Sequence, residues 1–130
     1  MRLVFVMALL LGTATAVLAQ PAPPAGAMQT YDIPTTGKPQ TFTMLRRVLK
    51  PNEVLPMHTH RGAEITWVVR GTVRLTMGGV SHIYHAGESF LIPRGVAHSP
   101  ANAGNDDAEV AVNYILDKGA PLSDPAPAAH

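Results

Sequence analysis

The feature that most constrains the fold is a succession of short β-rich segments separated by glycine turns, with no segment that keeps a helical period. The clearest pair is Thr72–Met77 and Val80–His85, because Gly78-Gly79 between them is a strong hairpin signal. Apolar and polar residues alternate along the first of these segments, as in a half-buried strand. The other main expected strands are residues 41–50, 64–70, 89–92 and 110–116. This pattern predicts an all-β sandwich or barrel.

Four residues in this region could together hold a metal ion: His58, His60, Glu64 and His98. His58 and His60 are two positions apart, so on a strand both side chains leave the same face. Glu64 follows a short break and can add a carboxylate. Imidazole suits Zn, Cu, Fe or Ni, and a carboxylate adds affinity for harder ions such as Mn. The set predicts a mononuclear transition-metal site.

The sequence around these residues resembles the two motifs of the cupin family. The first motif is matched by His58-x-His60, Glu64 and Gly71, and the second by Gly87, Pro93-x-Gly95, His98 and Asn102, with the family spacing throughout. The resemblance covers roughly residues 41–116. It implies a single-domain double-stranded β-helix, the jelly-roll cupin barrel, with His58, His60, Glu64 and His98 as the metal ligands.

One position departs from the cupin pattern. Asn52 stands where the first motif usually opens with glycine. Asparagine tolerates left-handed backbone better than most residues, so we expect the turn to form.

The resemblance does not fix a reaction, because cupins include dioxygenases, decarboxylases, isomerases, lyases, binding domains and storage proteins. Four protein ligands would leave two adjacent positions open on an octahedral ion, and open positions are typical of catalytic sites. We expect a metal-dependent enzyme acting on a small oxygen-rich compound, with a dioxygenase-like oxidoreductase favoured. The alternative is a non-catalytic metal or small-molecule binding module, since no general base is recognisable and no catalytic residue can be assigned.

The N-terminal residues predict export. A basic Arg2 precedes an apolar run over residues 3–11 and small residues up to Ala19, which is the pattern of a secretory signal peptide. The run is shorter than the roughly 20 residues that span a bilayer, so we expect cleavage after Ala19, a periplasmic or secreted protein, and no stable membrane anchor. The predicted organisation is a signal peptide (1–19), a Pro-rich lead-in with a first short strand (20–40), the cupin barrel (41–116) and a disordered tail (117–130).

Export would affect which metal ion the site acquires. A chain that acquires its ion outside the cytoplasm binds by raw affinity, which favours Cu and Zn. We therefore expect one divalent transition metal ion, Zn or Cu as isolated, with Fe, Mn and Ni as further options. The chain has no cysteine, which excludes a thiolate ligand and a cysteine nucleophile.

The charge balance and the strand pattern indicate which kinds of partner the chain could bind. Of ten basic and nine acidic residues, cleavage would remove Arg2 and leave nine of each, which argues against nucleic-acid binding. We expect a small-molecule ligand or substrate. By analogy with small cupins a homodimer is a further hypothesis, with residues 41–50 as a strand edge for pairing.

Several other residues carry a structural and a functional interpretation. Trp67 is expected to pack inside the barrel. His82 and His85 are three apart and so face opposite sides of a strand. We expect them to be exposed, and the competing hypothesis makes one of them an acid or base beside the metal; Tyr84 has the same two interpretations. Glu88 is expected to hydrogen-bond the backbone of its turn.

Overall fold

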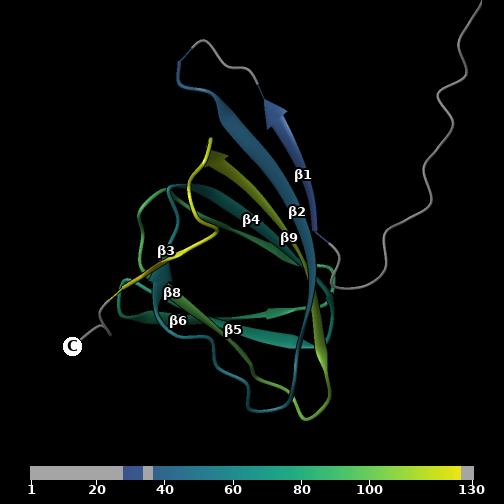
Figure 1. Cartoon of the computed structure of the whole chain (residues 1–130). Helices are drawn as coiled ribbons and strands as arrows, with labels where there is room; N and C mark the ends of the chain where they lie inside the picture. The colour runs from purple at the N-terminus through teal and green to yellow at the C-terminus, as the bar shows by residue number, and fades with distance from the viewer. Residues whose placement is uncertain (1–27, 34–36, 127–130) are drawn as a thin grey trace, which may run out of the picture.

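The computed structural model describes residues 28–33 and 37–126, and in this part of the chain it contains ten strands and no helix (Figure 1). One sheet has the order β1 (Met28–Ile33), β2 (Gln40–Leu49), β9 (Ala108–Asp117), β4 (Gly62–Arg70) and β7 (Ser89–Ile92). The other has the order β10 (Asp124–Pro125), β3 (His58–Thr59), β8 (His98–Asn102), β5 (Thr72–Met77) and β6 (Val80–His85).

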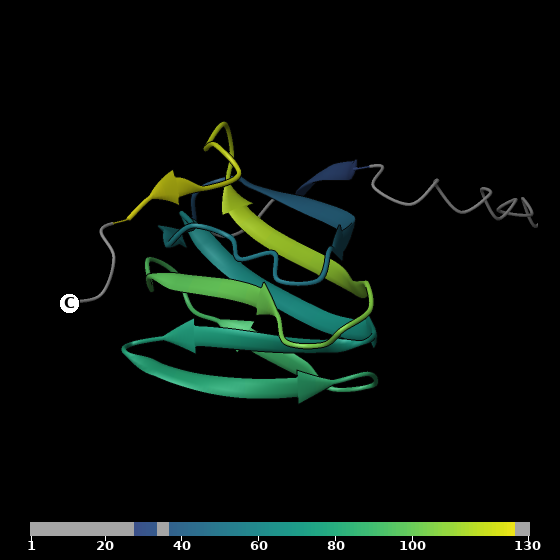
Figure 2. The same ribbon diagram turned by 90° about the horizontal axis from the view of Figure 1, so that it is seen from below.

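The two sheets are antiparallel throughout and face each other, as the turned view in Figure 2 shows. Neighbouring strands are mostly distant in sequence, as in β2–β9 and β5–β8. This is the jelly-roll arrangement that the sequence predicted, and the all-β fold class is confirmed.

The core lies between the sheets and follows from the two-residue period of the strands. Along β9 the side chains of Val110, Val112, Tyr114 and Leu116 are buried, and the residues between them are only partly buried. Leu75 on the opposite sheet is 1% exposed and packs in the same cluster. Apolar burial of this kind is the main stabilising contribution to the fold.

The prediction that Trp67 packs inside the barrel is wrong. Its side chain is 54% exposed on the outer face of β4. Glu64, Thr66 and Val68 on the same strand face inward, and the alternation of a strand then directs Trp67 outward. The inward position of Glu64, rather than the size of the indole, decides the face.

Gly62 lies where the chain crosses from β3 in one sheet to β4 in the other. A Cβ built on Gly62 would lie 1.9 Å from the carbonyl oxygen of Ile115 on β9, so no side chain fits there. This close approach lets β4 begin against β9 directly after His60, and the side chains of His60 and Glu64 then meet, with Nε2 2.8 Å from Oε2.

Two expectations at the ends of the barrel need correction. Residues 117–126 do not form a disordered tail, because β10 pairs with β3 and Asp124 forms an ion pair with Arg61 at 2.8 Å. The segment 41–50 does not offer a free edge, because β2 pairs with β1 on one side and with β9 on the other. The homodimer itself stays a prediction.

The turn at Asn52 forms as expected, with a φ of 65° in the left-handed region. The predicted signal peptide, most of the Pro-rich lead-in and residues 127–130 lie outside the described residues. Across the residues that are described, the structure has no helix long and apolar enough to cross a membrane.

Candidate metal centre

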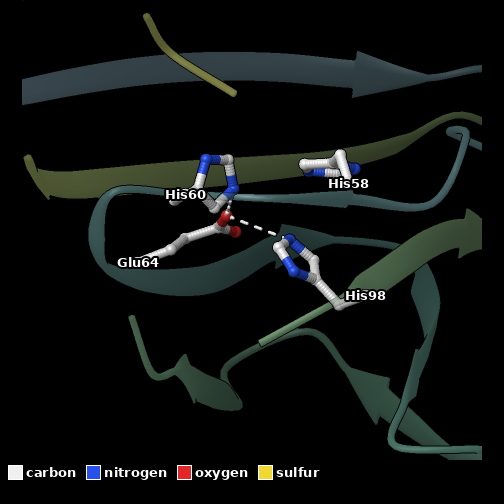
Figure 3. A group of neighbouring side chains, drawn as sticks. All are labelled: His58, His60, Glu64 and His98. Carbon is white, nitrogen blue, oxygen red and sulfur yellow. Dashed lines mark ion pairs between the residues drawn. The ribbon is translucent and has the colours of Figure 1, made fainter. Parts of the chain in front are cut away.

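The structure brings the side chains of His58, His60, Glu64 and His98 together between the two sheets (Figure 3). His58 lies on β3 and pairs directly with His98, the first residue of β8, so these two side chains leave neighbouring strands of one sheet. His60 follows β3, and Glu64 faces them from β4 in the other sheet. Their potential ligand atoms all lie within 4.8 Å of one another.

Each imidazole is oriented by a backbone carbonyl. The Nδ1 atoms of His58, His60 and His98 lie 2.8, 2.6 and 2.9 Å from the carbonyl oxygens of Pro56, Leu122 and Val96. A carbonyl oxygen only accepts hydrogen bonds, so each Nδ1 carries the proton and donates. In the neutral rings the Nε2 atoms are therefore left with free lone pairs.

The Nε2 atoms of His60 and His98 show that these residues fit a cation. Both atoms are buried and neither has a hydrogen-bond partner in the described part of the chain. They face one oxygen of Glu64, Oε2, at 2.8 and 3.5 Å. Lone pairs placed this close to a buried carboxylate repel unless a proton or a metal ion lies between them.

The separations also suit a single ion. Nitrogen ligands about 2.1 Å from one ion lie about 3 Å apart when adjacent and about 4 Å apart when opposite. Oε2 of Glu64 lies 2.8 and 3.5 Å from the Nε2 atoms of His60 and His98, which is in this range, and all the potential ligand atoms lie within 4.8 Å of one another, slightly beyond it. The three histidines and Glu64 could therefore hold one divalent transition metal ion with little movement.

Glu64 is kept ionised by its contacts. Burial raises the pKa of Glu64, but hydrogen bonds from His60 and His98, donated when a proton sits on Nε2, and from the hydroxyl of Thr66 outweigh burial and lower the pKa to about 2. Thr66 donates to Oε1 of Glu64 at 2.6 Å, which leaves Oε2 facing the histidines. A charged and oriented carboxylate is what a cation site requires.

His58 is the most accessible of the three imidazoles. Its ring centroid lies 4.9 Å from that of His60 and 4.2 Å from that of His98. Burial lowers the pKa of His58, and the neighbouring imidazoles act in the same direction. The ring therefore stays neutral, and able to bind a metal, to a lower pH than an exposed histidine.

A cavity of about 370 Å³ opens beside the cluster. It is lined by His58, His60 and Glu64 and by residues of the two sheets, the segment before β3 and the segment leading into β10. Its size lies in the range of small-molecule sites. The apolar part of the lining includes Leu45, Leu49, Val73, Phe90, Val110 and Val112.

The other sequence candidates lie away from this cluster. His82 and His85 are exposed on β6, an edge strand. Tyr84 is half-buried and packs on Phe90, with ring centroids 4.7 Å apart. Glu88 accepts a hydrogen bond from the backbone N–H of His85 at 2.6 Å, as expected for a turn residue.

Sequence reasoning missed three contributors to the site. Thr66 is two residues after Glu64 on the same strand, so its position on the same face could have been inferred. Tyr114, opposite Glu64 across β4 and β9, required the strand register. The carbonyl of Leu122 required the position of the chain after β9, which no local sequence signal gives.

Comparison with known proteins agrees with this geometry. A family model described as a cupin domain matches residues 45–114. The chain is 36% identical over 74 residues to germin-like protein subfamily 3 member 1 of Arabidopsis thaliana and 33% identical over 81 residues to oxalate oxidase 2 of Hordeum vulgare. These matches cover 51% and 55% of this chain but only 35% and 36% of the two relatives.

Solved structures show the same fold. A Cupin 2 conserved barrel domain protein from Salinispora arenicola matches with a TM-score of 0.55 at 20% identity, over 80% of this chain and 92% of that one. A protein with a double-stranded β-helix domain from Klebsiella pneumoniae matches with a TM-score of 0.53 at 16% identity, over 83% and 90%. At these identities the likeness concerns the fold alone.

Proposed function

The chain belongs to the cupin family, and from the geometry of its site we propose that it is a metal-dependent enzyme, a dioxygenase-like oxidoreductase that acts on a small oxygen-rich compound. The observation that carries the proposal is the pair of buried, unpartnered Nε2 atoms of His60 and His98 facing the Glu64 carboxylate. An oxalate oxidase among the relatives supports a substrate with adjacent oxygens.

Different residues would bind the ion, orient the ligand side chains and line the cavity. His58, His60, His98 and Glu64 would hold one divalent ion, Zn or Cu as isolated, with Fe, Mn and Ni as further options. When bound, the ion supplies a Lewis acid or an electron relay. The backbone carbonyls fix the three rings before any ion binds, and apolar side chains form much of the cavity wall beside the site.

One observation favours a second function, a non-catalytic metal or small-molecule binding module. Among the described residues that line the cavity, Glu64 is the only carboxylate, and His58 and His60 are the only imidazoles. All three are assigned to the ion, so no side chain of these types is left as a general base. Turnover would then require chemistry in which the ion and the substrate need no protein base.

The two functions are separated by metal analysis followed by activity measurements. The purified protein is analysed for metal, reloaded with each candidate ion, and assayed for oxygen uptake with catechol-like, thiol and dicarboxylate compounds. Uptake that depends on the metal and is lost in His60→Ala supports the enzyme. Binding of these compounds without uptake at any metal supports the binding module. Absence of stoichiometric metal contradicts the enzyme and the metal-binding form of the module.

We also propose that the chain is exported to the periplasm or secreted, with a small-molecule partner and no nucleic acid. The support is the pattern of residues 1–19 and the balanced charge of the remainder. Mass spectrometry of the protein from the producing cell should find an N-terminus at or near Gln20. A mature protein that retains Met1 would contradict export through a cleaved signal.

A further inference from the structure

The cavity beside the metal centre has polar side chains whose hydrogen bonds can be assigned one by one. Thr66 donates to Glu64 at 2.6 Å. Arg47 lines the cavity near its rim and pairs with Glu53 at 3.3 Å. Ser123 is exposed at the segment leading into β10. These three groups are therefore already partnered or open to solvent.

Tyr114 is different. Its side chain is 7% exposed and lines the cavity, and within the described residues its hydroxyl has no hydrogen-bond partner. The hydroxyl is not among the buried polar atoms that are sealed from solvent, so it opens on the cavity. A phenol hydroxyl is protonated at neutral pH and is a hydrogen-bond donor. A donor in this position is satisfied either by water or by a ligand.

Tyr114 lies directly beside the metal centre. It pairs with Glu64 across β9 and β4, and its ring centroid is 4.9 Å from that of His60 at an interplanar angle of 60°. The phenol ring therefore lies against one of the potential ligands and across from another, on the wall of the same cavity.

The next row of side chains that face the cavity, counted along the strands from Tyr114, is apolar except for Thr66. Two residues further along the strands, Leu45, Val112 and Phe90 lie side by side with Thr66 in the β2–β9–β4–β7 register, and all line the cavity. The row is about 7 Å from the Tyr114 row, because a strand rises about 3.4 Å per residue. A further row on, Arg47 pairs with Val110. Between the polar metal end and Arg47, the cavity therefore offers a mostly apolar surface on the scale of an aromatic ring.

We propose that Tyr114 is a specificity-determining residue, whose hydroxyl donates a hydrogen bond to the oxygen-bearing head of the ligand at the metal centre, and that this ligand carries a ring-sized apolar body lying over Leu45, Val112 and Phe90. The inference rests on the proposed function, since the head must bind at the ion. It narrows the ligand class, because a compound made of carboxylates alone leaves the apolar row in contact with water.

The test uses two probes that share a head of two adjacent oxygens and differ in the body. Oxalate has no apolar body, and benzoylformate carries a phenyl ring. Binding to the zinc-loaded full chain is measured by calorimetry for the wild type, for Tyr114→Phe and for the matched control Tyr84→Phe, which removes a hydroxyl from a half-buried tyrosine outside the cavity lining. Zinc content is measured for each protein.

The wild type should bind benzoylformate at least about tenfold more tightly than oxalate, because the phenyl ring leaves water. Tyr114→Phe should keep one zinc per chain and weaken both probes by about tenfold, since both share the head. Tyr84→Phe should bind like the wild type. These results would support the inference.

Two other outcomes are distinguishable. If the zinc-loaded wild type binds neither probe, the open metal position of the proposed function fails, and this inference fails with it. If the wild type binds oxalate as tightly as benzoylformate, or if Tyr114→Phe binds both probes as the wild type does, the inference is overturned while the metal centre stands.

Discussion

Strands β9 and β3 differ in almost every respect, although both border the same interior. β9 has ten residues, pairs with β2 along its whole length and with β4 along most of it, and buries every second side chain. β3 has two residues, with one ladder pair to β8 and two to β10. Yet β3 and the residue after it supply two of the four potential ligands, and β9 supplies none.

The difference shows how the fold separates stability from chemistry. β9 is held by its ladder and by apolar burial, which are insensitive to the direction of any one side chain. Strand β3 makes few backbone pairs with its neighbours. The rings of the histidines near it are fixed one at a time by hydrogen bonds from Nδ1 to backbone carbonyls. Changes in the sheets should therefore alter stability, and changes at the cluster should alter metal binding.

The largest effect is expected when the site loses one histidine next to β3 and the histidine of β8. Replacing His60 and His98 by Ala together should abolish binding of a divalent ion, because His58 and Glu64 alone cannot fill the site. Metal content of dialysed protein is the measurement. His82→Ala, on the exposed edge strand, is the control and should keep one ion per chain. Retention of the ion by the double variant would break the assignment.

A substitution in the apolar core should have the opposite effect, a loss of stability without a loss of metal binding. Leu75→Ala removes a fully buried side chain from the cluster between the sheets and should lower the free energy of unfolding by about 2–5 kcal/mol. The variant should still bind one ion when it is folded, because Leu75 is neither one of the four potential ligands nor part of the cavity lining. Denaturant unfolding of metal-free protein and a zinc titration below the melting temperature would check both parts. Loss of metal binding in a folded Leu75→Ala protein would contradict the separation.

A smaller effect is expected from a group that supports a ligand without being one. Thr66→Val removes the hydroxyl that donates to Glu64 Oε1 but keeps a branched side chain of similar size. Metal affinity should fall by about 10- to 100-fold, the usual loss for such supporting contacts. Competition with a chelator measures it. An unchanged affinity would mean that Glu64 is oriented by burial alone.

The smallest perturbation is a change of pH. Metal affinity should change little at neutral pH and should fall in acid, because protons then compete with the metal for the imidazole nitrogens. Burial lowers the pKa of His58, so this ligand should be lost only below about 6.5, the ordinary value for histidine. Glu64, with its pKa held at about 2, stays charged in this range and does not add to the fall. In metal-free protein the lowered pKa stabilises the fold above pH 4.5, and this contribution is lost as pH falls toward 2. A fall in zinc affinity that begins well above pH 7 would be inconsistent with histidine ligands.

The sequence predicted the parts that repeat or that follow a spacing rule. The hairpin at Gly78-Gly79, the alternating strands and the four potential ligands could all be found, because strand period and motif spacing are local properties. Trp67 was misplaced because hydrophobicity was weighed above the period that Glu64 sets. Tyr114 and the Leu122 carbonyl could not be found, since both depend on which distant strands lie side by side.

In the proposed metal centre the three histidines bind an ion through Nε2, while Nδ1 stays protonated and donates to a carbonyl. Nitrogen-15 NMR of the imidazole rings, recorded before and after addition of one equivalent of Zn²⁺, tests it directly. We expect His58, His60 and His98 each to show a protonated Nδ1 and an Nε2 whose chemical shift is changed by the metal. The chemical shifts of His82 and His85 should be unchanged. Spectra in which the three rings are the same with and without Zn²⁺, or in which Nδ1 is the shifted nitrogen, would contradict it.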